Sequence, residues 1–131
     1  MLNNGHYIDT TWQERESEKA LESGPLERLF AGNATAKMLD FLSTFREFDY
    51  SESDIARYSG VSIRHAQREL PKLERLKLIK MTRTSGKSKM YRMDTESQTG
   101  ILASKFGLAL AGIEVADVLA KEKQKEKPLT A

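Results

Sequence analysis

The sequence predicts a mainly α-helical domain that carries one small β-hairpin and ends in a long helix. Apolar residues recur at helical spacing from residue 34 to residue 76. Between residues 79 and 93 they alternate with polar residues, which is the period of half-buried strands. From residue 101 to residue 120 the chain is apolar almost without interruption. A length of 131 residues, with 39% hydrophobic and 31% charged residues, fits one globular domain.

Two short helices are expected first, after a polar N-terminal stretch in which residues 12–22 could form a charged helix. One helix covers residues 34–47, and its apolar face consists of Met38, Leu39, Leu42 and Phe45. The other covers residues 52–59 and begins after Ser51, whose side chain is a suitable N-cap. Gly60 follows it and can adopt the positive φ of a tight turn.

The third helix begins after a second suitable cap, Ser62. Pro71 lies inside this helix and cannot donate a hydrogen bond to the carbonyl of Gln67, so a kink or a tightening is expected there. The core positions of the helix step by three or four residues, and they are Ala66, Leu70, Leu73 and, at its end, Leu76.

A β-hairpin is expected directly after the third helix. Ile79 and Met81 alternate with polar residues and mark the first strand. Tyr91 and Met93 share one face of the second strand, which returns from a flexible basic tip at residues 85–88.

The last helix is expected over residues 96–122, opened by a capping box of Thr95 and Gln98. Its apolar stretch is long enough to test as a membrane span. It contains Lys105, Glu114 and Asp117, and a Lys or Asp near the centre of a span costs about 2.5 to 3.5 kcal/mol. We therefore expect no membrane insertion.

A helix this apolar must bury more than one face, and the rest of the chain offers few elements to cover it. Homodimerisation through this helix is the first expectation, and a central buried helix in a monomer is the alternative. A ridge of small residues, Ala103, Gly107 and Ala111, also permits close approach of another backbone. The residues expected to dimerise are Leu102, Phe106, Gly107, Ala109, Ile113 and Ala116.

The formal net charge of +2 conceals an uneven distribution. Residues 1–56 carry 5 Lys/Arg against 11 Asp/Glu, residues 57–92 carry 11 against 2, and residues 93–131 carry 5 against 6. The middle block therefore has a net charge of +9, which favours a surface that binds a polyanion. A solvated basic face without a partner is the alternative.

Several kinds of chemistry are excluded by composition or by incomplete motifs. The absence of cysteine rules out disulfides, thiolate zinc sites and a cysteine nucleophile, and His6 and His65 are too few for a histidine metal cluster. Residues 85–88 resemble only the end of a phosphate-binding loop. No nucleophile with a partner base presents itself, so we expect no enzyme, no metal and no cofactor. No signal peptide is visible at the N-terminus, and the expected location is the cytoplasm, on the nucleoid.

The segment Ser51–Asp94 resembles winged helix-turn-helix DNA-binding domains, most closely the small bacterial and archaeal regulators of the ArsR and MarR type. The resemblance rests on Ile55-Ala56, on the turn Ser59–Ser62 with Val61 buried and Ser62 capping, on the third helix, and on the basic wing around Gly86 with its returning aromatic Tyr91. The sequence departs from the family at Pro71 and at Lys77, where the family often has glycine. Lys77 must therefore tolerate a helix-ending conformation that glycine takes more easily.

The resemblance implies a polar N-terminal arm over residues 1–25, a DNA-binding domain over 26–94, a dimerisation helix over 95–122 and a charged tail over 123–131. The third helix would enter the major groove of double-stranded DNA, and the wing would contact the backbone or the minor groove. Residues expected to contact bases are Ile63, Arg64, His65, Gln67 and Arg68. Residues expected to contact phosphates are Ser62, Lys72, Arg83, Lys87, Ser88 and Lys89.

The expected function is that of a homodimeric, sequence-specific, DNA-binding transcriptional regulator. Two alternatives stay open. One is an architectural or partition-type protein that coats DNA with little sequence choice. The other is a winged-helix module that binds an unknown protein partner, since the fold alone does not decide function.

Overall fold

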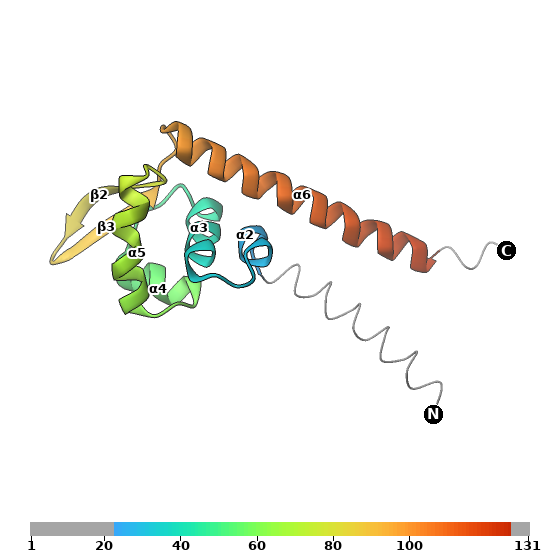
Figure 1. Cartoon of the computed structure of the whole chain (residues 1–131), viewed down its shortest axis with the longest axis horizontal. Coiled ribbons are helices and arrows are strands. Elements are labelled where there is room, and N and C mark those ends of the chain that lie inside the picture. Colours follow the sequence, from blue (N-terminus) through green and yellow to red (C-terminus); the bar gives the residue numbers. More distant parts are fainter. Residues whose placement is uncertain (1–22, 127–131) are drawn as a thin grey trace, which may run out of the picture.

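The computed structural model describes residues 23–126, and Figure 1 shows their arrangement. The helix expected over residues 12–22 and the end of the charged tail lie outside the described residues. The elements in chain order are α2 (Pro25–Leu29), α3 (Ala34–Thr44), β1 (Tyr50–Ser51), α4 (Glu52–Ser59), α5 (Ile63–Arg75), β2 (Ile79–Ser85), β3 (Ser88–Met93) and α6 (Gln98–Glu126).

Helices α3, α4 and α5 pack around one core and are closed on one side by a small sheet. Both expected caps are confirmed: Ser51 Oγ accepts the N–H of Asp54, and Ser62 Oγ accepts the N–H of His65, each at 3.1 Å. Gly60 has a φ of 74°, as the turn between α4 and α5 requires. The core consists of Met38, Leu42, Ile55, Ala56, Ala66, Leu70, Leu73, Ile79, Tyr91 and Met93.

The sheet has three antiparallel strands in the order β1-β3-β2. Strands β2 and β3 form the expected hairpin, with Gly86 at a φ of 63° in its two-residue turn. The short strand β1 was not expected from the sequence, and it pairs Tyr50 with Tyr91. A bulge between Met81 and Arg83 leaves Thr82 as an extra residue of β2.

The helix-turn-helix formed by α4 and α5, with β2 and β3 as its wing, confirms the expected fold class. Helix α5 runs through Pro71 to Arg75 as one helix. Lys77 then has a φ of 61°, so the glycine-like ending expected for this position is confirmed. In Figure 1 the wing projects at one end of the molecule, and α6 extends past α2 at the other end.

Four sequence-based expectations are corrected. Helix α3 ends at Thr44 rather than at residue 47, because Phe45 adopts non-helical angles and is half exposed. Leu76 is 57% exposed instead of continuing the core face, because it is already the C-cap of α5. Val61 is half-buried rather than buried, and Met81 is 43% exposed because β2 leaves the core after Ile79.

The start of α6 is also corrected. The capping box of Thr95 and Gln98 is wrong, since α6 begins only at Gln98. The carboxylate of Asp94 accepts the N–H groups of Glu96 and Ser97, and Ser97 Oγ accepts the N–H of Gly100. Burial opposes ionisation of Asp94, yet these backbone donors and nearby cations hold its pKa below its usual range.

Helix α2 contains only five residues, and its start is fixed by a side chain from α3. Asp40 Oδ1 accepts the N–H of Leu26 at 3.0 Å, and Oδ2 accepts the N–H of Glu27 at 2.8 Å. Gly24 makes this approach possible, because a Cβ at that position would lie 2.1 Å from Asp40 Oδ2. Asp40 is 8% exposed and is the one buried polar or charged residue among residues 23–126.

We predict that Asp40→Ala lowers the free energy of unfolding by about 1–3 kcal/mol, because it leaves two buried N–H groups of α2 without an acceptor. Urea unfolding at neutral pH measures the change. Glu47→Ala, which removes an exposed carboxylate without a hydrogen bond among residues 23–126, should change stability by less than about 0.5 kcal/mol. Equal effects of the two substitutions would contradict the assignment.

The side chain of Asp40 should also make the free energy of unfolding depend on pH. Burial raises the pKa of Asp40, although the N–H donors of α2 oppose the shift. The protonated form therefore favours the folded state, and this contribution is present below the unfolded pKa and is lost as pH rises through the folded pKa. The wild type should therefore lose stability relative to Asp40→Asn, whose side chain cannot ionise, as pH rises from about 3.9. A difference that is constant with pH would contradict this.

The left-handed backbone conformation of Lys77 marks a position where a substitution should stabilise the protein. A left-handed conformation costs a residue with a Cβ about 1–2 kcal/mol, and the greater freedom of unfolded glycine returns about 0.5–1 kcal/mol of that cost. Lys77→Gly should therefore raise the free energy of unfolding by roughly 0.5–1 kcal/mol in thermal or urea unfolding. Lys77→Ala is the control, because it removes the charge and keeps the strain. A gain of the same size in both variants would attribute the effect to charge.

Candidate nucleic-acid interface

The exposed face of α5 carries most of the residues expected to contact bases. Ile63, Arg64, Gln67 and Arg68 are exposed, while His65 is half-buried. The opposite face is buried in the core through Ala66, Leu70 and Leu73. The exposed residues follow the cap Ser62 within the first two turns, so they lie at the end of α5 whose backbone dipole attracts anions.

The described contacts distinguish Arg64 from Arg68 and Lys72 among the cations of α5. Arg64 has no hydrogen bond or ion pair among residues 23–126. Arg68 donates from Nη2 to Nδ1 of His65 at 2.9 Å, and its Nε lies 3.7 Å from Glu69. Lys72 Nζ lies 3.4 Å from the same Glu69 carboxylate. Arg64 is therefore free to contact a ligand, while Arg68 and Lys72 share an acidic neighbour.

The tip of the wing presents cations that have no partner within the described part of the chain. Lys87 follows Gly86 in the turn, and Lys89 lies on β3 opposite Thr84. Both are exposed, as is the hydroxyl-bearing Ser88 between them. Figure 1 shows the tip extending away from the helices, at the opposite end of the molecule from the C-terminal end of α6.

Arg83 has the environment least expected from the sequence. Its guanidinium forms a fork with Asp49, from Nε to Oδ2 at 3.0 Å and from Nη2 to Oδ1 at 3.3 Å. Thr82 Oγ1 donates to the same Oδ2 at 2.5 Å. Hydrogen bonds from Arg83 and Thr82 hold the pKa of Asp49 below its usual range, and Asp49 correspondingly raises that of Arg83.

Sequence reasoning missed Asp49 and Glu69, the two carboxylates that lie among these cations. Asp49 belongs to the acidic first block of the sequence and reaches Arg83 only because β1 joins the sheet. Glu69 had a local signal, since it lies three residues before Lys72 on one helix. Glu69 is already counted in the net +9 of residues 57–92, whereas Asp49 lies outside that block and lowers the local positive charge further.

The face of α6 that points away from the rest of the protein is strongly apolar. Five of the six residues expected to dimerise are exposed on it, with Ile113 63% exposed. Gly107 differs, because it is buried and a Cβ there would lie 3.9 Å from Leu26. The ridge of small residues thus faces α2 and the core within the same chain. The exposed large apolar residues of α6 are Ile101, Leu102, Phe106, Leu108, Ile113, Val115 and Leu119.

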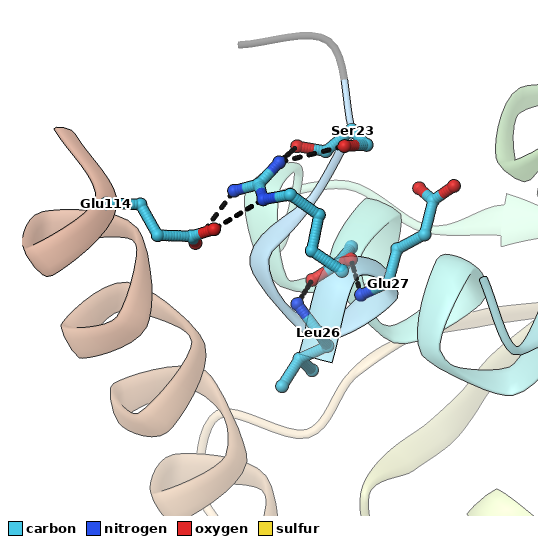
Figure 2. Close-up of polar contacts among 6 residues, drawn as sticks. Ser23, Leu26, Glu27 and Glu114 are labelled. Atoms are coloured by element: carbon cyan, nitrogen blue, oxygen red, sulfur yellow. Dashed lines mark hydrogen bonds and ion pairs between the residues drawn. The ribbon is translucent and has the colours of Figure 1, made fainter. Parts of the chain in front are cut away.

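An ion pair connects α6 to α2. The guanidinium of Arg28 donates from Nε and Nη2 to the carboxylate of Glu114, and from Nη1 to Ser23, as Figure 2 shows. The hydrogen bond with Glu114, partly offset by burial, raises the pKa of Arg28. A groove of about 800 Å³ lies beside this pair, between α6 and the aromatic side chains Phe41 and Phe45 at the end of α3.

Residues 23–126 contain no candidate membrane span and no candidate metal cluster. No helix in this range is long and apolar enough to cross a bilayer. No group of three or more His, Cys, Asp or Glu side chains within it could hold a metal ion.

Comparison with known proteins identifies the fold. The chain is similar to the crystal structure of MepR, a transcription regulator of the Staphylococcus aureus multidrug efflux pump MepA, with a TM-score of 0.61 and 18% identity over 95% of this chain and 93% of that chain. It is also similar to a mutant of Lactococcus lactis ZitR in apo form, with a TM-score of 0.51 and 19% identity over 75% of this chain and 73% of that chain. No protein-family model and no curated protein matches it. At these identities the likeness establishes a winged helix-turn-helix fold.

Proposed function

We propose that this protein is a homodimeric, sequence-specific, double-stranded DNA-binding transcriptional regulator. The observation that carries the proposal is the exposed face of α5, where Arg64 and Gln67 lie without partners among residues 23–126, beside a basic wing. The similarity to MepR, a transcription regulator, supports the same role. DNA binding would place the protein on the nucleoid, in the cytoplasm.

The side chains at the start of α5 favour sequence recognition over simple coating of DNA. Arginine can donate two hydrogen bonds to O6 and N7 of guanine, and glutamine can pair with N6 and N7 of adenine. Arg64 and Gln67 are exposed on the same face of α5 and carry these two chemistries. Lys87 and Lys89 at the wing fit phosphates, which supply affinity without sequence choice. We propose a binding role and no catalytic role.

The apolar face of α6 supports the homodimer. Soluble proteins rarely leave a continuous row of large apolar side chains in water, and such a row commonly marks an interface. Leu108 and Ile113, at 71% and 63% exposure, belong to this row on α6. Pairing two copies through this face would present two α5 helices to half-sites about one helical turn apart.

We predict that substitutions on α5 and on the wing differ in kind. Arg64→Ala should reduce discrimination at one base position by about 1–3 kcal/mol, because it removes a contact to a base edge. Lys87→Ala should weaken binding to all sequences alike and lower the slope of log affinity against log salt by about 1, because it removes a phosphate contact. Selection from a random DNA library at two salt concentrations, followed by titration of the selected fragment, measures both effects.

The selection also separates the alternative functions. A palindromic motif supports the regulator. Salt-dependent binding without a motif would favour the architectural role instead. No binding at moderate salt would overturn both DNA-binding roles and leave the protein-interaction module. Equal effects of Arg64→Ala and Lys87→Ala on every sequence would contradict the proposal that α5 contacts bases and the wing contacts phosphates.

We predict that Ile113→Glu converts the dimer to monomer. Burying an unpaired charge at the interface should cost roughly 3 kcal/mol or more, which weakens dimerisation at least about a hundredfold. Analytical ultracentrifugation measures the mass, and circular dichroism checks that the helices remain. Gln124→Glu adds the same charge beyond the apolar stretch of α6 and should leave the dimer intact. A monomeric wild type would contradict the proposed assembly directly.

A further inference from the structure

The contact between Asp49 and Arg83 spans the whole sheet of the winged helix. Asp49 directly precedes β1, Arg83 belongs to β2, and β3 lies between these two strands. The bulge at Thr82 changes the register of β2 at this point, so that Thr82 and Arg83 both contact one carboxylate. The side chain of Asp49 is 20% exposed, while that of Arg83 is 60% exposed. One edge of the Arg83 guanidinium is thus held by Asp49, and the rest of the side chain is open to solvent.

The two hydrogen bonds to Asp49 leave part of the Arg83 guanidinium without an acceptor among the described residues. Arginine has five N–H donors, and Asp49 occupies one on Nε and one on Nη2. The two hydrogens of Nη1 and the second hydrogen of Nη2 have no acceptor among the described residues. This remaining edge is itself a fork, and its geometry suits two oxygens of one phosphate.

We propose that Asp49 is a positioning residue for nucleic-acid binding, which holds Arg83 so that its free guanidinium edge meets a backbone phosphate beside the wing. The inference deepens the proposed function and rests on it. Asp49 itself does not contact the DNA. Its contribution is to immobilise a long side chain before binding, so that the ordering cost is not incurred on association.

Charge alone predicts that removal of the Asp49 carboxylate strengthens DNA binding, whereas positioning predicts that it weakens binding. Removing a carboxylate from a basic surface should strengthen binding to a polyanion, because repulsion is lost and the net charge rises. If positioning dominates, Asp49→Asn should instead weaken binding although the protein becomes more positive. We expect a loss of roughly two- to tenfold, which is the range for immobilising one long side chain.

The experiment measures dissociation constants for the DNA fragment selected by the wild type, with the full chain, at fixed salt. Glu47→Gln is the matched control, because it makes the same charge change two residues away at an exposed carboxylate without a partner among residues 23–126. It should bind as tightly as the wild type or slightly tighter. Arg83→Lys keeps the charge but loses the fork, and it should weaken binding about as much as Asp49→Asn.

A double-mutant cycle tests whether Asp49 acts through Arg83. Asp49→Asn should have no further effect in an Arg83→Ala background. An equal loss in both backgrounds would attribute the effect to the fold and overturn the inference. A readout without DNA accompanies the cycle: the Nε–H signal of Arg83 in nitrogen-15 NMR should be protected from exchange in the wild type and in Glu47→Gln, and lost in Asp49→Asn.

The outcomes separate the inference from the function on which it rests. If the wild type binds no DNA, both are overturned. If the wild type binds and Asp49→Asn binds as tightly or more tightly, the positioning role alone is overturned and the regulator stands. If Asp49→Asn binds more weakly, its loss depends on Arg83 and Glu47→Gln is unaffected, the positioning role is supported.

Discussion

The short helix α2 links α6 to the helices that form the core, and so helps to fix the position of α6 relative to α5. A helix of five residues leaves almost all of its backbone donors and acceptors unpaired, and it has no stability of its own. Asp40 supplies the acceptors at the start of α2, and Gly24 provides the space for that carboxylate. Arg28 then pairs with Glu114 on α6, while Leu26 packs against Gly107. In the proposed dimer, this joint, together with the packing of Ala103 against the core, would set the separation of the two α5 helices.

The distribution of acidic residues limits how the basic surface can act. A uniform +9 patch would bind any polyanion, because phosphate attraction does not depend on sequence. Glu69 and Asp49 instead engage Arg68, Lys72 and Arg83 within the chain. Arg64 near the start of α5 and the two lysines at the wing are among the cations that remain without a partner in the described range. The carboxylates thus reduce general attraction and fix the geometry of the cations that they hold.

The sequence was a good guide wherever structure depends on near neighbours. The periodicity of Ala66, Leu70 and Leu73, the two serine caps and the strained ending at Lys77 all follow from residues within one or two turns. Strand β1 and the Asp49 contact could not be predicted, because they depend on how segments more than thirty residues apart meet. The prediction of the α6 cap failed for a local reason. Three neighbouring polar residues compete to accept the N–H groups at the start of this helix, and the strand pairing before it holds Asp94 in place.

The two faces of α6 explain why a helix so apolar occurs in a chain of this size. The face with Ala103 and Gly107 is covered by other elements of the same chain, because its small residues let α2 and the core approach closely. The opposite face, with Phe106 and Ile113, has no covering element among residues 23–126. A monomer would expose that face, whereas a second copy related by a two-fold axis would cover it with the same face and bury both. The same symmetry would impose a palindrome on the DNA, so the apolar periodicity of α6 and the form of the binding site would have one common cause.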